Sequence, residues 1–375
     1  MGSQNAQRSV RIALFNWRDR MHPAAGGAEQ YTHDLLCALA NAGHVCTWIA
    51  SKVPGRPDCE DCGDYTVLRM GSELTCRFFA ARWLWQNRHA VDVVVDEVNT
   101  LPFFSRMIAP RKTKVLIHQL AREVWWYEAP RPLAALGYVL EPLLLRLYRS
   151  TPAITISNSS ASSLRAIGLR GSIDVIESPS LPPVERERYS RTPHRLGYVG
   201  RITPSKRIDH IVRAFAFVLQ KFPGAQLWIV GGGSSKELAK LKRLADELQC
   251  SGRVHFTGYV SRDERDAIMA SLDCLVLASV REGWGLVVSE AARFGVPAVA
   301  YDTFGLRDAI VDGVTGLLAR PQHPSALATA IAEILADSEM RNRLGIAASE
   351  NLIRLSYHTF SQKVRARIAE PCLRA

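Results

Sequence analysis

Short apolar runs alternate with amphipathic helical segments along the first half of this chain. Parallel sheets that helices cover on both faces show this pattern, because their strands are buried on both sides. The first helical segment is predicted over Ala28–Ala42, where the large apolar residues fall on one face. Strands are predicted at Val10–Asn16, Val45–Ala50, Val91–Val95, Val115–His118 and Ala153–Ser157.

The same alternation starts again after residues 177–194, a segment rich in Pro, Ser and charge that is typical of a linker. Predicted strands follow at Leu196–Val199, Gln226–Val230, Val254–Thr257, Cys274–Ala278 and Ala298–Tyr301. Predicted helices lie at Ile208–Phe222, Ser235–Gln249, Arg262–Ser271, Leu286–Phe294 and Ser325–Asp337. The chain is therefore expected to be an α/β protein with two doubly wound, Rossmann-like domains that face each other across a cleft. Ligands in such sheets bind beyond the carboxyl ends of the strands.

Composition limits the class of protein further. The 375 residues are 47% hydrophobic and 22% charged, which argues against a disordered chain. No apolar run approaches the roughly 20 residues that span a bilayer, and Met1–Arg11 lacks the apolar core of a secretory signal. Eight cysteines without repeating spacing favour free thiols in a reducing cytoplasm.

The formal charge of +11 indicates an anionic partner, with nucleic acid, acidic lipid and a phosphorylated small molecule as alternatives. Residues 101–150 hold eight basic and three acidic side chains, and residues 341–375 hold seven and two. Both blocks also carry apolar residues at helical spacing. Solvated helix faces are therefore the alternative to a binding surface.

Two glutamates flank the start of one predicted helix. Glu282 precedes Gly283 and Gly285, which leave the backbone open, and Glu290 lies eight residues further on, inside the helix. Free N–H groups at a helix start can hold an anion, and carboxylates can accept hydrogen bonds from sugar hydroxyls. This pattern suits a ligand that combines phosphate with a polyol. The alternative is that both glutamates only favour the helix dipole or face solvent.

Basic residues and glycines follow other predicted strands. Arg201 and Lys206 lie on the turn after the first strand of the second half, where they can bind a diphosphate. Gly26 and Gly27 lie after the first strand of the chain, where the backbone can approach a ligand closely. A solvated loop or an ordinary turn is the alternative in each case, and also for Gly231-Gly-Gly233.

Further candidates lie near predicted strand ends. The place of His118 at a carboxyl end favours a role in the cleft over a buried structural histidine. Weaker candidates for the same cleft are Asp19, Arg122, Glu123 and Asn158. Cys59 and Cys62 have the spacing of a metal or redox pair, but no second pair accompanies them, so a metal site is the less favoured interpretation.

The segment Val124–Arg149 opens with aromatic residues and continues as an apolar helical stripe. The residues on and beside the stripe are Leu136, Val139, Leu140, Leu143, Leu144 and Leu147. A stripe of this width predicts a core-facing helix. The alternative is that the aromatic residues, with Arg146 and Arg149, dock the first domain on anionic lipid or on a lipid-linked acceptor.

Together the motifs resemble the large GT-B glycosyltransferase family with a Glu-x7-Glu motif, often called family 4. The resemblance covers nearly the whole chain and rests on Gly26-Gly27-Ala-Glu-Gln30, His118, Gly200-Arg201, Lys206, Gly231–Gly233, Glu282 and Glu290. It implies a GT-B fold with an acceptor-side domain at 1–182 and a nucleotide-sugar-binding domain at 183–355. A C-terminal helix at 356–375 would cross back to the first domain and bring the two basic blocks together.

The resemblance also implies a reaction and residue roles. A retaining enzyme would move a sugar from a nucleoside diphosphate donor without a metal or other cofactor, and no Asp-x-Asp metal motif stands at a strand end. Arg201 and Lys206 would hold the diphosphate, and Glu290 the nucleotide ribose. Glu282 would accept hydrogen bonds from the donor sugar. Backbone amides beside it would come from Gly283, Trp284, Gly285 and Leu286.

The remaining implied contacts are spread over both domains. Gly26 and Gly27 would close over the phosphate, and His118 would lie near the donor sugar and the point of transfer. The loop that contains Tyr259 is expected to select the base, with UDP, GDP and ADP open. Trp284 stands where the family often has Phe, which would reshape the sugar pocket, and residues 177–180 lack the Asn-Gly pair common in the hinge.

The expected acceptor is a hydroxyl group of a glycan, a lipid-linked sugar or a small molecule, in cell-envelope, polysaccharide or glycoconjugate synthesis. A sugar-nucleotide epimerase on the same plan is the alternative enzyme. A dehydrogenase lacks its Gly-rich fingerprint, and no nucleic-acid-binding signature is present. The expected location is the cytoplasm, with the inner face of the membrane as a peripheral site.

Overall fold

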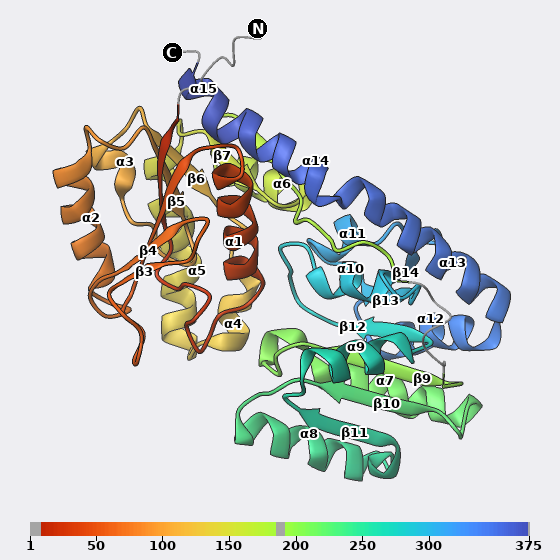
Figure 1. The fold of residues 1–375 in the computed structure, drawn as a ribbon. Coiled ribbons are helices and arrows are strands. Elements are labelled where there is room, and N and C mark those ends of the chain that lie inside the picture. The colour runs from red at the N-terminus through yellow and green to blue at the C-terminus, as the bar shows by residue number, and fades with distance from the viewer. Residues whose placement is uncertain (1–8, 185–191, 374–375) are drawn as a thin grey trace, which may run out of the picture. The chain divides into compact units, whose positions relative to one another are not determined.

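The computed structural model describes residues 9–184 and 192–373, which divide into two compact units (Figure 1). Unit 1 contains the described residues of 1–121, 138–179 and 357–375, and unit 2 those of 122–137 and 180–356. Within the predicted linker 177–194, residues 185–191 lie outside the described residues. The roles expected for 1–182, 183–355 and 356–375 stay predictions, because this division does not test them.

Unit 1 is built on one mostly parallel sheet. Its described strands follow the order β3-β4-β2-β1-β5-β6-β7-β8, and β3 pairs antiparallel with β4. The strands are β1 (Arg11–Phe15), β2 (Val45–Ala50), β3 (Cys59–Asp61), β4 (Thr66–Arg69), β5 (Val93–Glu97), β6 (Thr113–Leu116), β7 (Ala153–Thr155) and β8 (Ile173–Val175). The helices are α1 (Gly27–Ala40), α2 (Cys76–Asn87), α3 (Ser105–Ile108), α6 (Asn158–Ala166), α14 (Tyr357–Val364) and α15 (Glu370–Leu373).

Burial of one face of each helix holds unit 1 together. Helix α2 packs Leu84 against strand residues such as Phe15 and Val94, and α6 packs Leu164 against Val115. Helix α1 buries Tyr31, whose ring meets that of Phe360 on α14 at 5.5 Å. Residues 357–373 thus belong to unit 1 and contribute Phe360 to its core, although they are far from α1 in sequence.

Unit 2 contains a sheet whose described strands are all parallel, in the order β11-β10-β9-β12-β13-β14. The strands are β9 (Arg195–Val199), β10 (Gln226–Val230), β11 (Val254–Gly258), β12 (Cys274–Leu277), β13 (Ala298–Tyr301) and β14 (Gly316–Ala319). The helices are α4 (Trp125–Glu128), α7 (Ile208–Lys221), α8 (Ser235–Glu247), α9 (Arg262–Ala270), α10 (Leu286–Ala292), α11 (Leu306–Ala309), α12 (Pro324–Ala336) and α13 (Ser338–Asn351). Helix α5 (Arg131–Leu145) contains the boundary between residues 137 and 138.

The predicted strands and helices are confirmed, with small shifts at their ends. β2 and β13 match their predicted bounds, and both consist mainly of apolar residues. β6 ends at Leu116, so His118 lies two residues beyond the strand rather than at its last position. β3, β4, β8, β14 and α2 were not predicted. These strands are three or four residues long, and α2 places aromatic residues on more than one face.

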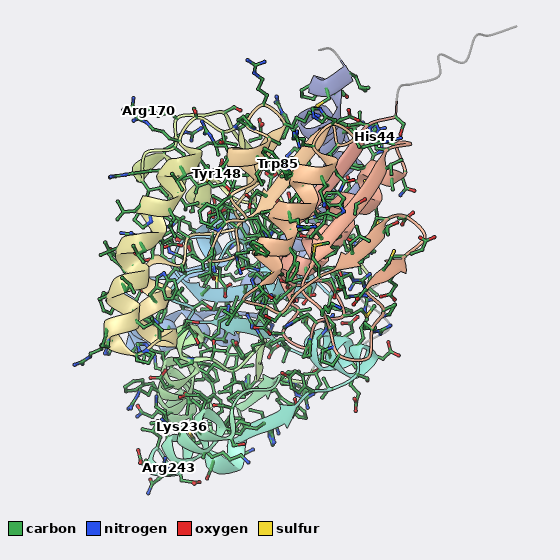
Figure 2. All side chains as sticks on the ribbon, turned by 90° about the vertical axis from the view of Figure 1, so that its left-hand side faces the viewer. His44, Trp85, Tyr148, Arg170, Lys236 and Arg243 are labelled. Carbon is green, nitrogen blue, oxygen red and sulfur yellow. The ribbon has the colours of Figure 1, made fainter. Side chains whose placement is uncertain are left out.

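The prediction of a core-facing stripe on α5 is wrong. Leu136, Leu140 and Leu143 are exposed, and the buried side of the helix is formed by Ala134, Glu141 and Leu145. Periodicity identifies the helix and its apolar face, but the small residue Ala134 and the hydrogen-bonded Glu141 occupy the side that packs inward. Figure 2 shows α5 in yellow with its side chains projecting from the ribbon.

The structure shows the state of the cysteines and the ion pairs made by the C-terminal basic block. None of the eight cysteines, all within the described residues, forms a disulfide, and Cys59 and Cys62 are exposed. No cluster of potential ligands suited to a metal ion occurs in residues 9–184 and 192–373, and no helix within them could cross a bilayer. Arg341 pairs with Asp273, Lys363 with Glu177 and Arg367 with Asp174. Part of the positive charge of residues 341–375 is therefore neutralised by these local ion pairs.

Asp34 on α1 generates a pH-dependent prediction. Burial raises the pKa of its carboxyl to about 6, from an ordinary 3.8, despite a hydrogen bond from Gln30. The folded state thus binds a proton more tightly than the unfolded state, and stability falls as the pH rises from 3.8 through 6. Asp34→Asn removes this penalty. The variant should melt about 2 °C or more above the wild type at pH 8, by circular dichroism.

The difference in melting temperature should shrink as the pH falls toward 5. Asp246→Asn on the exposed part of α8 is the control and should melt with the wild type at both pH values. A stabilisation by Asp34→Asn that is the same at pH 5 and pH 8 would contradict the account.

Candidate functional site

The candidate site of unit 2 lies where β9 and β12 run side by side. In the order β11-β10-β9-β12-β13-β14, the chain runs from β9 to β10 and β11 on one side and then crosses to β12 on the other side of β9. Ligands bind at such a switch point, beyond the carboxyl ends of the two strands. The turn after β9 carries Arg201 and Lys206, and the turn after β12 carries Ser279 and Glu282. Sheet order thus brings together residues that are far apart in sequence.

Lys206 and Glu282 form an ion pair across these two turns. The Lys206 Nζ atom lies 2.5 Å from Glu282 Oε1, and the Ser279 hydroxyl donates to the same oxygen at 2.7 Å. Lys206 ends a short 3-10 helix, Pro204–Lys206, whose proline starts the turn. The side chains of the pair remain 23% and 18% exposed, so a ligand can reach both charges.

A third turn, after β13, fixes the backbone of Glu282. The Glu282 N–H donates to the carbonyl of Phe304 at 3.0 Å. A Cβ atom on Gly305 would lie 2.2 Å from the Glu282 carbonyl oxygen, and Gly305 has a φ of +83°. Both the close approach and the left-handed backbone therefore require glycine here.

The loop from Gly283 to Leu286 combines a buried tryptophan side chain with glycine backbone. The Trp284 side chain is 3% exposed, and its indole N–H donates to Ser289 at 3.2 Å. The ring thus packs inside the unit, so the backbone is the part of Trp284 that remains available to a ligand. Gly285 has a φ of +91° and precedes α10, which begins at Leu286.

The other predicted residues of unit 2 lie on neighbouring turns. Arg201 is exposed, and its carbonyl accepts a hydrogen bond from the buried Tyr198 hydroxyl at 2.7 Å. Glu290 lies on α10, 3.5 Å from a guanidinium nitrogen of Arg265. Tyr259 is exposed, and its ring stands over the backbone of Gly232.

The triple glycine after β10 has a steric reason. A Cβ atom on Gly231 would lie 2.0 Å from the Gly200 carbonyl oxygen, and Gly231 has a φ of +132°. The Gly231 N–H donates to the Gly258 carbonyl at 2.9 Å. The turns after β9, β10 and β11 therefore pack backbone to backbone. This packing supports the turn after β9, which contains Arg201.

Arg281 was not predicted, and it anchors the segment before Glu282. It is buried, donates to Glu123 at 2.9 Å and stacks on the Phe304 ring at 4.2 Å. Burial raises the pKa of Glu123, but the hydrogen bond from Arg281 and nearby positive charge outweigh it and hold that pKa below its usual value. Glu123 and Arg281 thus have a structural explanation.

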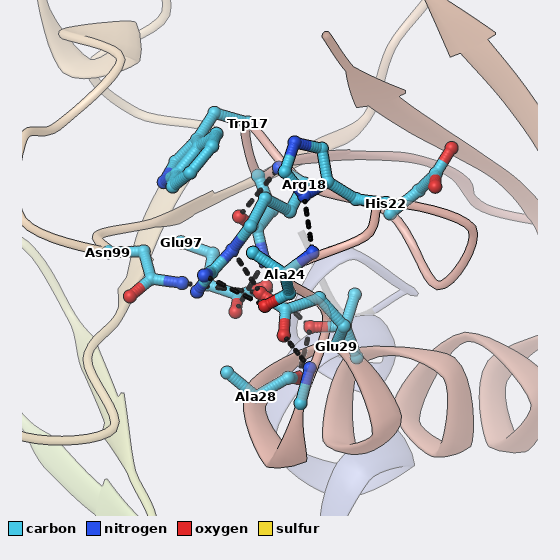
Figure 3. A network of polar contacts seen from close by, with 12 residues as sticks. Trp17, Arg18, His22, Ala24, Ala28, Glu29, Glu97 and Asn99 are labelled. Atoms are coloured by element: carbon cyan, nitrogen blue, oxygen red, sulfur yellow. Dashed lines mark hydrogen bonds and ion pairs between the residues drawn. The ribbon is translucent and has the colours of Figure 1, made fainter. Parts of the chain in front are cut away.

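Unit 1 has its own switch point between β1 and β5. Asn16 after β1 donates to Glu97 Oε1 at the end of β5 at 2.8 Å. Arg18 Nε lies 2.8 Å from Glu29 Oε1, and the Asn99 amide donates to the same oxygen at 3.4 Å. Figure 3 shows this network, in which the loop after β1, helix α1 and the loop after β5 share buried carboxylates.

The predicted residues of unit 1 belong to this network. His118 Nε2 lies 3.0 Å from Glu97 Oε1, and the His118 side chain is 12% exposed. The Gly26 N–H donates to Glu29 Oε2 at 2.7 Å, which holds the glycine turn at the start of α1. Glu97 and Glu29 were not predicted, since only the pairing of β1 with β5 brings them to the site.

The two weaker candidates of unit 1 differ in their burial. Asp19 is buried in an ion pair with Arg69, so it explains packing rather than ligand binding. Asn158 is exposed at the first position of α6.

Replacement of Glu97 should destabilise the protein. Glu97 is fully buried and accepts hydrogen bonds from Asn16 and Thr32 as well as His118. Glu97→Ala leaves these donors without their acceptor, at about 1–3 kcal/mol for each one. The variant should melt about 6 °C or more below the wild type in a thermal scan.

Glu73→Ala is the matched control, because Glu73 also meets a histidine, at 3.1 Å from His22, but is 60% exposed. An exposed pair of this kind contributes less than about 1 kcal/mol. Equal losses in the two variants would show that burial of the Glu97 network does not set its contribution.

Two family models match the chain. The model for Glycosyltransferase Family 4 matches residues 25–179, and the model for Glycosyl transferases group 1 matches residues 185–351. The D-inositol 3-phosphate glycosyltransferase of Nocardia farcinica is 37% identical over 158 residues, 41% of this chain and 35% of that protein. The Mycolicibacterium smegmatis protein of that name is 35% identical over 191 residues, 48% of this chain and 43% of that protein. These matches span less than half of each relative.

Solved structures with the same fold cover nearly all of the chain. Sucrose-phosphate synthase from Thermosynechococcus elongatus has a TM-score of 0.78 and 22% identity, covering 98% of this chain and 100% of that chain. Anabaena HepE, solved with UDP and glucose, has a TM-score of 0.71 and 17% identity, covering 96% and 100%. Likeness at these identities shows the fold. Because the two family models between them match most of both units, the chain belongs to the family 4 glycosyltransferases and has the GT-B fold.

Proposed function

We propose that this chain transfers a sugar from a nucleoside diphosphate sugar to a hydroxyl acceptor, with retained anomeric configuration and without a metal ion. The observation that carries the proposal is the Lys206–Glu282 pair at the switch point of unit 2. An ammonium group suits a diphosphate, and a carboxylate suits sugar hydroxyls. A nucleoside diphosphate sugar presents both groups together.

Arg201 and Lys206 have the proposed role of stabilising the leaving group. When the bond between the sugar and the diphosphate oxygen breaks, negative charge grows on the diphosphate. Two preorganised cations stabilise that charge as it develops. In this proposal they supply the charge that a divalent metal supplies in other transferases.

Retention follows from attack on the face that the diphosphate leaves. The acceptor oxygen forms the new bond to the anomeric carbon, and its proton passes to the departing phosphate oxygen. This step uses no carboxylate nucleophile. Its electrons and protons balance within donor and acceptor, so no further reactant is required.

Glu282 has the proposed role of binding the donor sugar. When the donor enters, Lys206 exchanges the carboxylate for phosphate, and Glu282 accepts from sugar hydroxyls while it keeps the Ser279 hydrogen bond. Glu290 exchanges Arg265 for the ribose hydroxyls. The backbone of residues 283–286 and the exposed Tyr259 ring complete the proposed donor contacts.

In unit 1, Gly26 and Gly27 are proposed to contact the donor phosphate, and His118 the donor sugar near the point of transfer. Glu97 holds the His118 ring through Nε2, which fixes the orientation of the imidazole. This contact leaves Nδ1 as the nitrogen that His118 can offer to a substrate.

The relatives suggest which substrates to test first. HepE was solved with UDP and glucose, so we propose a UDP-sugar as the first donor. The curated relatives are D-inositol 3-phosphate glycosyltransferases, so a phosphorylated polyol is the first acceptor to test, before lipid-linked and glycan acceptors. An epimerase, the alternative, would convert the donor alone, and none of the relatives named above is described as one. We propose the cytoplasm as the location of this protein, because its eight cysteines without repeating spacing are typical of a reducing compartment.

Removing either proposed diphosphate cation should slow transfer. Arg201→Ala and Lys206→Ala should each lower acceptor-dependent release of nucleoside diphosphate at least about 100-fold, because each removes a charge that stabilises the leaving group. The donor is chosen by a thermal-shift screen of UDP, GDP and ADP sugars, and EDTA is present throughout.

Lys242→Ala and Arg243→Ala remove exposed cations from α8 and are the matched controls, which should keep the wild-type rate. Unchanged turnover in both site variants would overturn the role of the two cations. Loss of wild-type turnover in EDTA would overturn the metal-independent mechanism.

Glu282→Gln separates nucleotide binding from sugar transfer. Glu282 pairs with Lys206 and competes with phosphate for it, so its neutralisation should tighten binding of the sugar-free nucleoside diphosphate by about threefold or more. The same variant should transfer sugar at least about tenfold more slowly, since the sugar loses a charged acceptor of hydrogen bonds.

Titration calorimetry measures the first effect, and the release assay the second. Glu333→Gln on the exposed side of α12 is the control and should change neither. Weaker nucleoside diphosphate binding by Glu282→Gln would contradict the proposed exchange of partners.

A further inference from the structure

We propose that the outer face of α2 in unit 1 is the interface through which two copies of this chain form a dimer. The inference does not depend on the proposed transfer reaction. The large apolar side chains of this face, here called the α2 patch, are Leu74, Phe78, Phe79 and Trp85, which are 89%, 70%, 43% and 59% exposed. Figure 2 looks onto this side of α2 and labels Trp85 on it.

The helix that carries the α2 patch is anchored in unit 1. The residues buried on its inner side are Cys76, Ala80 and Leu84. In a helix with 3.6 residues per turn, Phe78, Arg82 and Trp85 lie on the opposite side. The rings of Phe78 and Phe79 contact each other edge to face, with centroids 5.6 Å apart. The patch is therefore ordered before a partner binds, which lowers the entropy lost on association.

The residue types of the α2 patch fit a protein partner. Aromatic side chains and arginine are the anchors of protein interfaces, because they bury a large area for little lost freedom. Arg82 is exposed on the same side of the helix as Phe78. The Arg88 guanidinium lies 4.3 Å from the centroid of the Trp85 ring, which holds that ring in place.

The size of the α2 patch suits a stable dimer. A large aromatic side chain has about 150–250 Å² of surface, so the four side chains expose on the order of 500 Å² at these fractions. Exposed polar residues on the same side of α2 are Thr75, Arg82 and Gln86. They raise the area that a partner can cover toward the roughly 800 Å² per partner of a stable interface.

Charge identifies the partner as a second copy. Helix α2 contains arginines and no acidic residue, and Glu73 lies just before it with a side chain that is 60% exposed. When two α2 helices cross antiparallel about a two-fold axis at Phe78, Arg82 of each copy lies opposite the partner's Glu73. Two ion pairs thus flank the aromatic centre. An axis between Phe79 and Ala80 would set Arg82 against the partner's Arg77, so charge also selects the register.

Sedimentation of the full chain tests the proposal. The wild type should be a dimer at about 50 µM, because interfaces of this size have micromolar or tighter dissociation constants. Phe78→Glu/Trp85→Glu should raise the dissociation constant at least about 100-fold, since both anchors are lost and like charges meet at the centre.

Ile346→Glu/Ile353→Glu is the matched control, because it adds the same charges at two exposed aliphatic positions in unit 2. It should sediment like the wild type. Circular dichroism of each variant shows whether the fold is kept.

A charge exchange tests whether the partner is a second copy. Glu73→Arg and Arg82→Glu should each weaken the dimer at least about tenfold, because each sets two like-charged pairs across the axis. The double variant Glu73→Arg/Arg82→Glu restores opposite charges only if one copy faces another, so it should dimerise nearly as well as the wild type.

A monomeric wild type overturns the proposal, and so does a dimer that Phe78→Glu/Trp85→Glu leaves intact. A double charge variant that dimerises no better than the two single variants overturns the antiparallel arrangement.

Discussion

The ion pair of Lys206 with Glu282 is the interaction on which the site of unit 2 depends. The pair joins the turns after β9 and β12, and their neighbouring position follows from the sheet order alone. The Phe304–Gly305 turn fixes the backbone of Glu282. The preceding residue, Arg281, is buried and stacks on the Phe304 ring. The ammonium group and the carboxylate are thus partly buried but still accessible to a ligand. The proposed donor offers Lys206 a phosphate in place of the carboxylate and offers Glu282 sugar hydroxyls in place of the ammonium group.

Unit 1 also has charged residues at its switch point, but its carboxylates are more deeply buried than Glu282. Glu97 and Glu29 are buried at the switch point between β1 and β5, where they hold the loop after β1, the start of α1 and His118. Because these carboxylates are fully paired, they position other groups rather than bind a ligand themselves. The residues left at the edge are the Gly26–Gly27 backbone and the partly exposed His118 ring.

Apolar runs and residue spacing predicted most of the fold. They predicted less of the site, because its contacts join residues that are far apart in sequence. β2 and β13 follow from apolar runs, and Gly283, Gly285 and the two glutamates mark their turn through spacing. The contact of Asn16 with Glu97 joins residues 81 positions apart, and Arg281 with Glu123 joins residues 158 apart. No local pattern carries such pairs. The stripe of α5 shows the same limit, since periodicity identifies an apolar face but not what lies against it.

A crystal structure with the nucleoside diphosphate that stabilises the chain most would show directly whether Lys206 and Arg201 bind the diphosphate. We predict phosphate oxygens within hydrogen-bond distance of Lys206 Nζ and the Arg201 guanidinium, with Lys206 moved away from Glu282. A diphosphate bound elsewhere, with the 2.5 Å Lys206–Glu282 pair unchanged, would contradict it.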